Sequence, residues 1–239
     1  MPASTLVLIP ARNEAATVAE IVAAAHGHGV AEVVVIDDAS TDDTAVRAQV
    51  AGARVLPLAV PLGAWGAIQT GLRYARDRGA FSVITMDADG QHRAEDIVRL
   101  LQLLRAGDAD VVIGADPARV SRARRLAWRW FRMLTRFGLE DVTSGFRAYN
   151  PRAVRLLAGP EASLLDYQDI GVLLLLTRRG LRIREIPVAM NARRDGKSRV
   201  FSSWLVVARY MFQTSLLCLA RIGHHQARPA PRVADLQNS

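Results

Sequence analysis

Short apolar runs, separated by helical patterns and turns, constrain the fold of this chain more than any other feature. The clearest runs are Thr5–Ile9, Val33–Ile36, Phe81–Ile84 and Val111–Ile113. They show little alternation of apolar with polar residues, which is typical of parallel strands covered on both faces. At 239 residues the chain is long enough for one sizeable core. The sequence therefore predicts an α/β fold with an open, mostly parallel, doubly wound sheet flanked by helices.

Turn residues and helix starts divide the first half of this pattern. Ser40 and Asp43 have the spacing of a capping box and predict the start of a helix. A short strand is expected near Arg54–Leu58, followed by a turn over Gly63–Gly66 and a helix from about Ala67 to Asp77.

Two carboxylates, Asp87 and Asp89, follow directly after the strand run Phe81–Ile84. A helical pattern opens at Arg93–Ile97, so both acids are expected in a strand-to-helix loop. Open α/β sheets bind ligands at the carboxyl ends of their strands. A pair of carboxylates there can hold Mg²⁺ or Mn²⁺ together with phosphate oxygens. A solvated acidic loop is the simpler alternative, and other segments must decide between the two.

The other strand ends carry further motifs. No G-x-G-x-x-G or G-x-x-x-x-G-K-S/T phosphate loop is present. The motifs instead read P-x-x-N-E, D-D-x-S-T-D-x-T, D-A-D-G-Q-H, D-V-T-S-G-F-R, E-I-P-V and R-R-D-G-K-S-R, in that order along the chain. This series resembles the family 2 glycosyltransferases of the GT-A fold, and specifically their dolichol-phosphate-mannose-synthase-like branch. The resemblance covers roughly residues 4 to 200.

The resemblance implies two groups of residues around a sugar-nucleotide donor. The nucleoside pocket would be formed by Pro10, Arg12, Glu14 and Asp38. The metal, Mg²⁺ or Mn²⁺, would be bound by Asp87, Asp89 and Gln91, with His92 a hydrogen-bonding loop residue rather than a ligand. For Asp38 and Asp42, favourable electrostatics at a helix start is the alternative explanation.

The resemblance also implies the reaction. Arg193, Ser198 and Arg199 would contact phosphates, with Arg124 and Arg125 as further candidates; Asp89, Arg193 and Arg199 form the expected catalytic set. The implied activity is metal-dependent, inverting transfer of a sugar from GDP-mannose or a UDP-hexose to a polyprenyl phosphate of the cell envelope. Alternatives are transfer to a soluble, protein or glycan hydroxyl, a nucleotidyltransferase, and a non-catalytic nucleotide-sugar-binding protein.

Three segments depart from the pattern of that family or leave a role open. Pro61–Ala67 lacks the asparagine and second glycine of N-x-G-x-G-x-A, and Trp65 is expected to change the pocket wall. Gly114–Asp116 stands where G-S-R is usual, so a basic residue is missing there unless Arg119 replaces it. Arg147 is expected either to order the loop around Asp141 or to form an ordinary salt bridge.

The net charge of +8 is unevenly distributed along the chain. Seven arginines and no acid lie between residues 119 and 136, interleaved with tryptophan and phenylalanine. We expect residues 119–139 to form a helix at a membrane interface, which binds anionic lipid. Packing on the sheet and binding of nucleic acid are the alternatives, and we expect no nucleic-acid partner.

The expected organisation is a catalytic domain over residues 1–200, an amphipathic helix over 201–222 and a disordered tail over 223–239. Arg209 makes the second segment a poor membrane span. With no secretory signal and Cys218 as its one cysteine, the protein is expected in the cytoplasm, peripheral on the inner face of the cytoplasmic membrane. The sequence leaves oligomerisation open.

Overall fold

The computed structural model describes residues 4–116, 139, 141, 143–165 and 170–191. Its centre is a seven-stranded sheet in the order β3-β2-β1-β4-β6-β5-β7. The strands are β1 (Thr5–Ala11), β2 (Glu32–Asp37), β3 (Arg54–Pro57), β4 (Ser82–Thr85), β5 (Val111–Ala115), β6 (Arg147–Tyr149) and β7 (Ile183–Pro187). All pairings are parallel except those of β6, which runs antiparallel to both β4 and β5.

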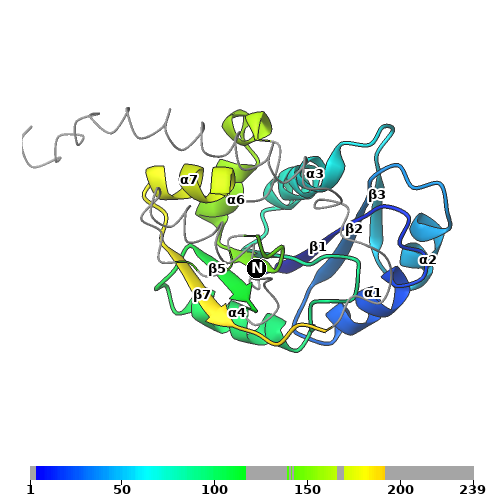
Figure 1. Ribbon diagram of the computed structural model, residues 1–239, viewed down its shortest axis with the longest axis horizontal. Helices are drawn as coiled ribbons and strands as arrows, with labels where there is room; N and C mark the ends of the chain where they lie inside the picture. Colours follow the sequence, from blue (N-terminus) through cyan, green and yellow to red (C-terminus); the bar gives the residue numbers. More distant parts are fainter. Residues whose placement is uncertain (1–3, 117–138, 140, 142, 166–169, 192–239) are drawn as a thin grey trace, which may run out of the picture.

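Helices cover both faces of the sheet, as Figure 1 shows. They are α1 (Val18–His26), α2 (Thr44–Val50), α3 (Gly63–Asp77), α4 (Asp96–Arg105), α6 (Pro151–Leu157), the short 3₁₀ helix η2 (Pro160–Leu164) and α7 (Ile170–Arg178). One core cluster joins α1, α2 and α4 to one face, and a second joins α3, α6 and α7 to the other. The predicted doubly wound, mostly parallel α/β fold is confirmed.

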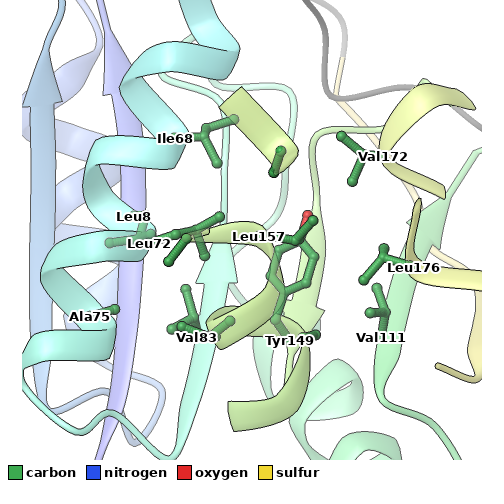
Figure 2. Packing of buried hydrophobic residues seen from close by; sticks show 14 of the residues in the cluster. Leu8, Ile68, Leu72, Ala75, Val83, Val111, Tyr149, Leu157, Val172 and Leu176 are labelled. Carbon is green, nitrogen blue, oxygen red and sulfur yellow. The ribbon is translucent and has the colours of Figure 1, made fainter. Parts of the chain in front are cut away.

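Successive residues of each central strand point to opposite core clusters. In β1, Leu6 and Leu8 pack under α3, whereas Val7 and Ile9 pack against α1. The packing under α3 and α6 is shown in Figure 2, where Leu8, Leu72 and Val83 meet. This burial on both faces explains why the strand runs contain few polar residues.

The antiparallel strand β6 positions the candidate site. Arg147 at its start pairs with Thr85 at the end of β4 and with Ile113 on β5. Because β6 runs against its neighbours, the residues before it, Ser144 to Phe146, lie at the carboxyl edge of the sheet. They are thereby brought close to the loop that follows β4.

Several local expectations need correction. Gly63–Gly66 is the first turn of α3 rather than a separate turn, so the helix begins four residues earlier than predicted. The predicted capping box is not formed. Ser40 accepts a hydrogen bond from the backbone of Asn13, and no side chain caps α2 at Asp43. Trp65, expected in the pocket wall, is buried, and its indole Nε1–H donates to the carbonyl of Ala162 in η2.

Some expectations fall outside the described residues. They include the basic-aromatic helix over 119–139, the amphipathic helix over 201–222 and the tail over 223–239. Within the described part of the chain, no helix is both long and apolar enough to cross a bilayer.

Candidate active site

The loop from Asp87 to His92, here called the D-A-D loop, begins two residues after β4 ends. The Asp87 side chain is 42% exposed, and Asp89 is a buried residue. One oxygen of Asp89, Oδ1, accepts the backbone N–H of Gln91 at 3.1 Å. Gly90 has a φ of 75°, a left-handed conformation that glycine adopts without strain. The loop therefore turns sharply and offers the Asp87 carboxylate to solvent.

His92 holds this loop from within. Its Nδ1 accepts the backbone N–H of Asp87 at 3.0 Å, and its ring stacks on Phe146 with centroids 5.1 Å apart. His92 Nε2 lies 3.7 Å from Asp87 Oδ2, too long for a direct hydrogen bond. The expectation that His92 is a hydrogen-bonding loop residue is confirmed.

Thr17, the residue before α1, supports the D-A-D loop. Its hydroxyl donates to the carbonyl of Ala88 at 2.6 Å, and both residues are buried. The two residues are 71 positions apart, and no local motif pointed to the contact. The middle residue of D-A-D is thus held by a buried hydroxyl.

The loops after β1 and β2 are joined by hydrogen bonds. Asn13 donates its backbone N–H to Ser40 Oγ at 2.9 Å, and its side-chain oxygen accepts the N–H of Thr41 at 2.8 Å. Asn13 has a φ of 53° and Ala39 a φ of 55°, so both adopt left-handed conformations. Asparagine tolerates that conformation better than most residues, and its amide can bond locally. The asparagine of P-x-x-N-E therefore joins two loops, a role that the sequence reading missed.

Asp38 has a structural role in addition to the one expected. Asp38 is 4% exposed, and its carboxylate accepts the backbone N–H groups of Leu62 at 2.6 Å and Gly63 at 3.0 Å. Leu62 is the N-cap of α3 and Gly63 is its first residue, so the acid does stabilise a helix start, although of α3 rather than α2. Its role toward a nucleoside stays a prediction.

Asp42 is the acid that supports the start of α2. It accepts hydrogen bonds from the N–H and hydroxyl of Thr44 and from the N–H of Ala15. Burial raises the pKa of Asp42, but the hydrogen bonds from Thr44 and Ala15 outweigh it, so the pKa lies below its usual value. The helix-start interpretation is confirmed for this residue.

The turn Ser144–Phe146, here called the S-G-F turn, lies directly against the D-A-D loop. A Cβ at Gly145 would be 2.7 Å from Oδ1 and 2.8 Å from Oδ2 of Asp87, closer than real contacts allow. The Ser144 hydroxyl donates to the carbonyl of Gly114 and accepts the N–H of Phe146. The S-G-F turn is thus fixed to β5 on one side and contacts Asp87 on the other.

Arg147 and Asp141 are buried beside this turn. Arg147 is fully buried, and its Nε–H donates to the carbonyl of Ser144 at 2.8 Å. Burial raises the pKa of Asp141, while hydrogen bonds from Thr143 and the charge of Arg147 lower it in part. The backbone N–H of Asp141 donates to Glu185 Oε1 of the E-I-P-V motif. Arg147 therefore orders the turn next to Asp141, which is one of the two roles expected for it.

The segment after β7 runs across to the D-A-D loop. Val188 N–H donates to the carbonyl of Ala115, Met190 N–H to Asp116 Oδ2, and Asn191 N–H to the carbonyl of Gln91 at 2.9 Å. Asp116, which replaces the arginine of G-S-R, thus anchors this segment. The basic residues expected at phosphates, namely Arg124, Arg125, Arg193, Ser198 and Arg199, lie outside the described part of the chain, as does Arg119.

The structure brings most of the described candidates to one edge of the sheet. Pro10 lies near the end of β1, Arg12 and Glu14 follow that strand, Asp38 follows β2, and the D-A-D loop follows β4. Arg12 is exposed, and Pro10 and Glu14 are partly exposed. These loops end parallel neighbouring strands, so they form one surface at the position where α/β sheets bind ligands.

Comparison with known proteins agrees with this arrangement. The profile described as glycosyl transferase family 2 matches residues 6–154. An undecaprenyl-phosphate mannosyltransferase of Micrococcus luteus is 31% identical over 190 residues, which cover 71% of this chain and 75% of that protein. A polyprenol monophosphomannose synthase of Mycolicibacterium smegmatis is 29% identical over 221 residues, covering 83% and 82% of the two chains.

A solved structure shows the same fold. Glucosyl-3-phosphoglycerate synthase from Mycobacterium tuberculosis, crystallised with Mn²⁺ and UDP-glucose, superposes with a TM-score of 0.72 at 24% identity. The match covers 93% of this chain and 80% of that one. The fold is therefore that of the GT-A glycosyltransferases. The profile match and the 31% identity together show that the chain belongs to glycosyl transferase family 2 and is a glycosyltransferase.

Proposed function

We propose that this enzyme transfers a sugar from a nucleotide-diphosphate sugar to a polyprenyl phosphate, with inversion at the anomeric carbon and with a divalent cation. The observation that carries the proposal is the similarity to two enzymes whose names both specify a polyprenyl lipid and mannose. GDP-mannose is accordingly the first donor to test, and UDP-hexoses are the second.

The side chains of the D-A-D loop suit Mg²⁺ or Mn²⁺. Asp87, Asp89 and Gln91 supply carboxylate and amide oxygens, which are the hard ligands that these ions prefer. Among the described residues, no cluster of three or more His, Cys, Asp and Glu side chains could hold a metal. This set accordingly needs further oxygens from the donor diphosphate. When bound, the ion would offset negative charge on the departing nucleoside diphosphate.

The protein's own residues would orient the reactants. The nucleoside is proposed to bind at Pro10, Arg12, Glu14 and Asp38. The carboxylates of Glu14 and Asp38 can accept hydrogen bonds from ribose hydroxyls and base N–H groups. Arg193, Ser198 and Arg199 are proposed at phosphates, with Arg124 and Arg125 as further contacts. Asn191, held on the D-A-D loop by its bond to Gln91, lies two residues before Arg193 in the sequence and supports that assignment.

The acceptor chemistry requires little from the protein. A phosphate monoester is ionised near neutral pH, so its oxygen can attack the anomeric carbon without a strong general base. A bond forms from that oxygen to the sugar carbon while the bond to the nucleoside diphosphate breaks. A hydroxyl acceptor, by contrast, would need a base within hydrogen-bonding reach.

A lipid acceptor also favours a position at the membrane surface. We propose peripheral attachment to the inner face of the cytoplasmic membrane through the arginine-rich sequence over residues 119–139. Each basic residue near an anionic leaflet contributes about 1 kcal/mol, and salt screens this attraction. Sedimentation with anionic and neutral vesicles at several salt concentrations tests this part of the proposal.

The activity test uses purified protein with Mn²⁺ and a polyprenyl phosphate. GDP-mannose, UDP-glucose and UDP-N-acetylglucosamine are supplied in separate reactions, and the organic phase is analysed for a lipid-linked sugar. Lipid-linked sugar from one donor supports the proposal. Transfer to a hydroxyl acceptor in a parallel reaction but none to the lipid, exchange of pyrophosphate, or donor binding without turnover would each contradict it.

A further inference from the structure

We propose that Gly145 is a positioning residue for Asp87: by having no side chain, it leaves the space that the Asp87 carboxylate occupies at the edge of the D-A-D loop. The effect of Gly145 on metal binding rests on the function proposed above. The part of the inference that concerns packing rests on the protein's own atoms alone.

The contact is specific to one side chain. The three atoms nearest to a Cβ built on Gly145 are all in the Asp87 carboxyl group, with Oδ1 at 2.7 Å, Oδ2 at 2.8 Å and Cγ at 3.0 Å. The carboxylate thus lies directly over the Cα of Gly145. An alanine there would meet Asp87 before any other residue.

Gly145 is itself held in place. The carbonyl of Gly145 accepts the hydroxyl of Thr85 at 2.7 Å, and the preceding Ser144 is bonded to Gly114 on β5. Gly145 does not have a positive φ, so its backbone conformation is open to alanine. The absence of a side chain is therefore required by the Asp87 carboxylate and not by the backbone.

The next residue fixes the other end of Asp87. Phe146 stacks on His92, whose Nδ1 accepts the backbone N–H of Asp87. The S-G-F turn thus limits Asp87 from two directions, with Gly145 at the carboxylate and Phe146, through His92, at the main chain. Because a metal ligand needs a fixed orientation, this packing is expected to favour cation binding.

Alanine at position 145 should be tolerated by the fold. The Asp87 side chain is 42% exposed, so its carboxylate can rotate toward solvent and release the overlap. The enzyme would then keep its fold but lose the orientation of one proposed metal ligand. Changes to residues that support metal ligands typically weaken metal affinity 10- to 100-fold, and about tenfold is expected here.

The experiment compares wild type, Gly145→Ala, Asp87→Ala and the double variant. Gly27→Ala is the matched control, because its added Cβ would lie 3.8 Å from the nearest atom, the carbonyl oxygen of Ala24. Thermal unfolding is measured in EDTA, and Mn²⁺ binding is measured by electron paramagnetic resonance in the presence of GDP or UDP.

The proposal predicts that Gly145→Ala lowers Tm in the wild-type background but not in the Asp87→Ala background. It also predicts weaker Mn²⁺ binding for Gly145→Ala, no further loss in the double variant, and wild-type behaviour for Gly27→Ala. Equal loss of Tm in both backgrounds, or wild-type Mn²⁺ affinity in Gly145→Ala, would overturn it. If wild type itself bound no Mn²⁺, the proposed function would fail instead, and the Tm comparison would still decide the packing claim.

Discussion

The hydroxyl of Thr17 donates to the carbonyl of Ala88 across 2.6 Å, which joins the start of α1 to the middle of the D-A-D loop. Thr17→Val removes this buried donor while keeping the shape of the side chain. We expect a loss of about 1 to 3 kcal/mol in the free energy of unfolding, because the carbonyl loses its partner. Urea unfolding measures this, with Thr17→Ser as the control that retains the hydroxyl; equal stability of the valine variant would contradict the role.

A second prediction concerns His92. His92→Phe keeps a ring against Phe146 but removes the acceptor for the backbone N–H of Asp87. We expect Tm to fall by several degrees and donor affinity to weaken, because the loop loses an internal tie. Calorimetric titration with GDP and UDP measures the second effect. Wild-type affinity for both nucleotides would show that the bond does not matter for the site.

The left-handed residue Ala39 provides a stabilising substitution. At a φ of 55°, alanine is strained and glycine is not, so Ala39→Gly should raise the free energy of unfolding by about 0.5 to 1 kcal/mol. Asn13→Gly relieves the same kind of strain but loses the bond to Thr41 N–H, so it should not stabilise the protein. Parallel urea titrations compare the two variants, and a destabilised Ala39→Gly would refute the strain argument.

Asp110, which directly precedes β5 at the edge of the sheet opposite to the candidate site, is expected to affect stability in acid. Burial raises the pKa of Asp110, but bonds from Arg182 and Asn150 and the charges of Arg152 and Arg182 outweigh it, so its pKa is lowered. A carboxylate with a lowered folded-state pKa stabilises the protein above the unfolded value of 3.8, and this stabilisation is lost as pH falls through the folded-state value.

Comparing the stability of Asp110→Asn with that of wild type tests whether the pKa of Asp110 is lowered. The stability difference between the two proteins should be largest near neutral pH and should shrink as the pH falls below about 4. The exposed neighbour Asp108→Asn is the control. A difference that grows on acidification would contradict the lowered pKa.

The sequence predicts the fold well because the signal is local. Strand runs such as Val33–Ile36 are buried on both faces, and the apolar residues of α1 recur at helical spacing and are buried, namely Val18, Ile21, Val22 and Ala25. β6 could not be predicted, since a strand of three residues is too short to show a periodic pattern of apolar residues. Its antiparallel direction depends on pairing with two distant strands.

Only those parts of the site that form sequence motifs could be predicted. The D-A-D loop and the acids after β2 were found because carboxylates at strand ends are visible in the sequence. Three contacts could not be predicted, because each joins residues more than twenty positions apart. They are those of Thr17 with Ala88, of Asp38 with Leu62, and of Gly145 with Asp87. Such contacts depend on the tertiary packing of loops and not on local spacing.

Asp87 and Asp89 are proposed to hold a cation together with the diphosphate of the donor. Crystals soaked with Mn²⁺ and GDP or UDP, with data collected at the manganese absorption edge, test it most directly. The account predicts one anomalous peak between the Asp87 and Asp89 carboxylates and the nucleotide phosphates, absent from Asp89→Ala crystals. A nucleotide bound at this edge with no peak at the D-A-D loop, or with the peak unchanged in Asp89→Ala, would contradict it.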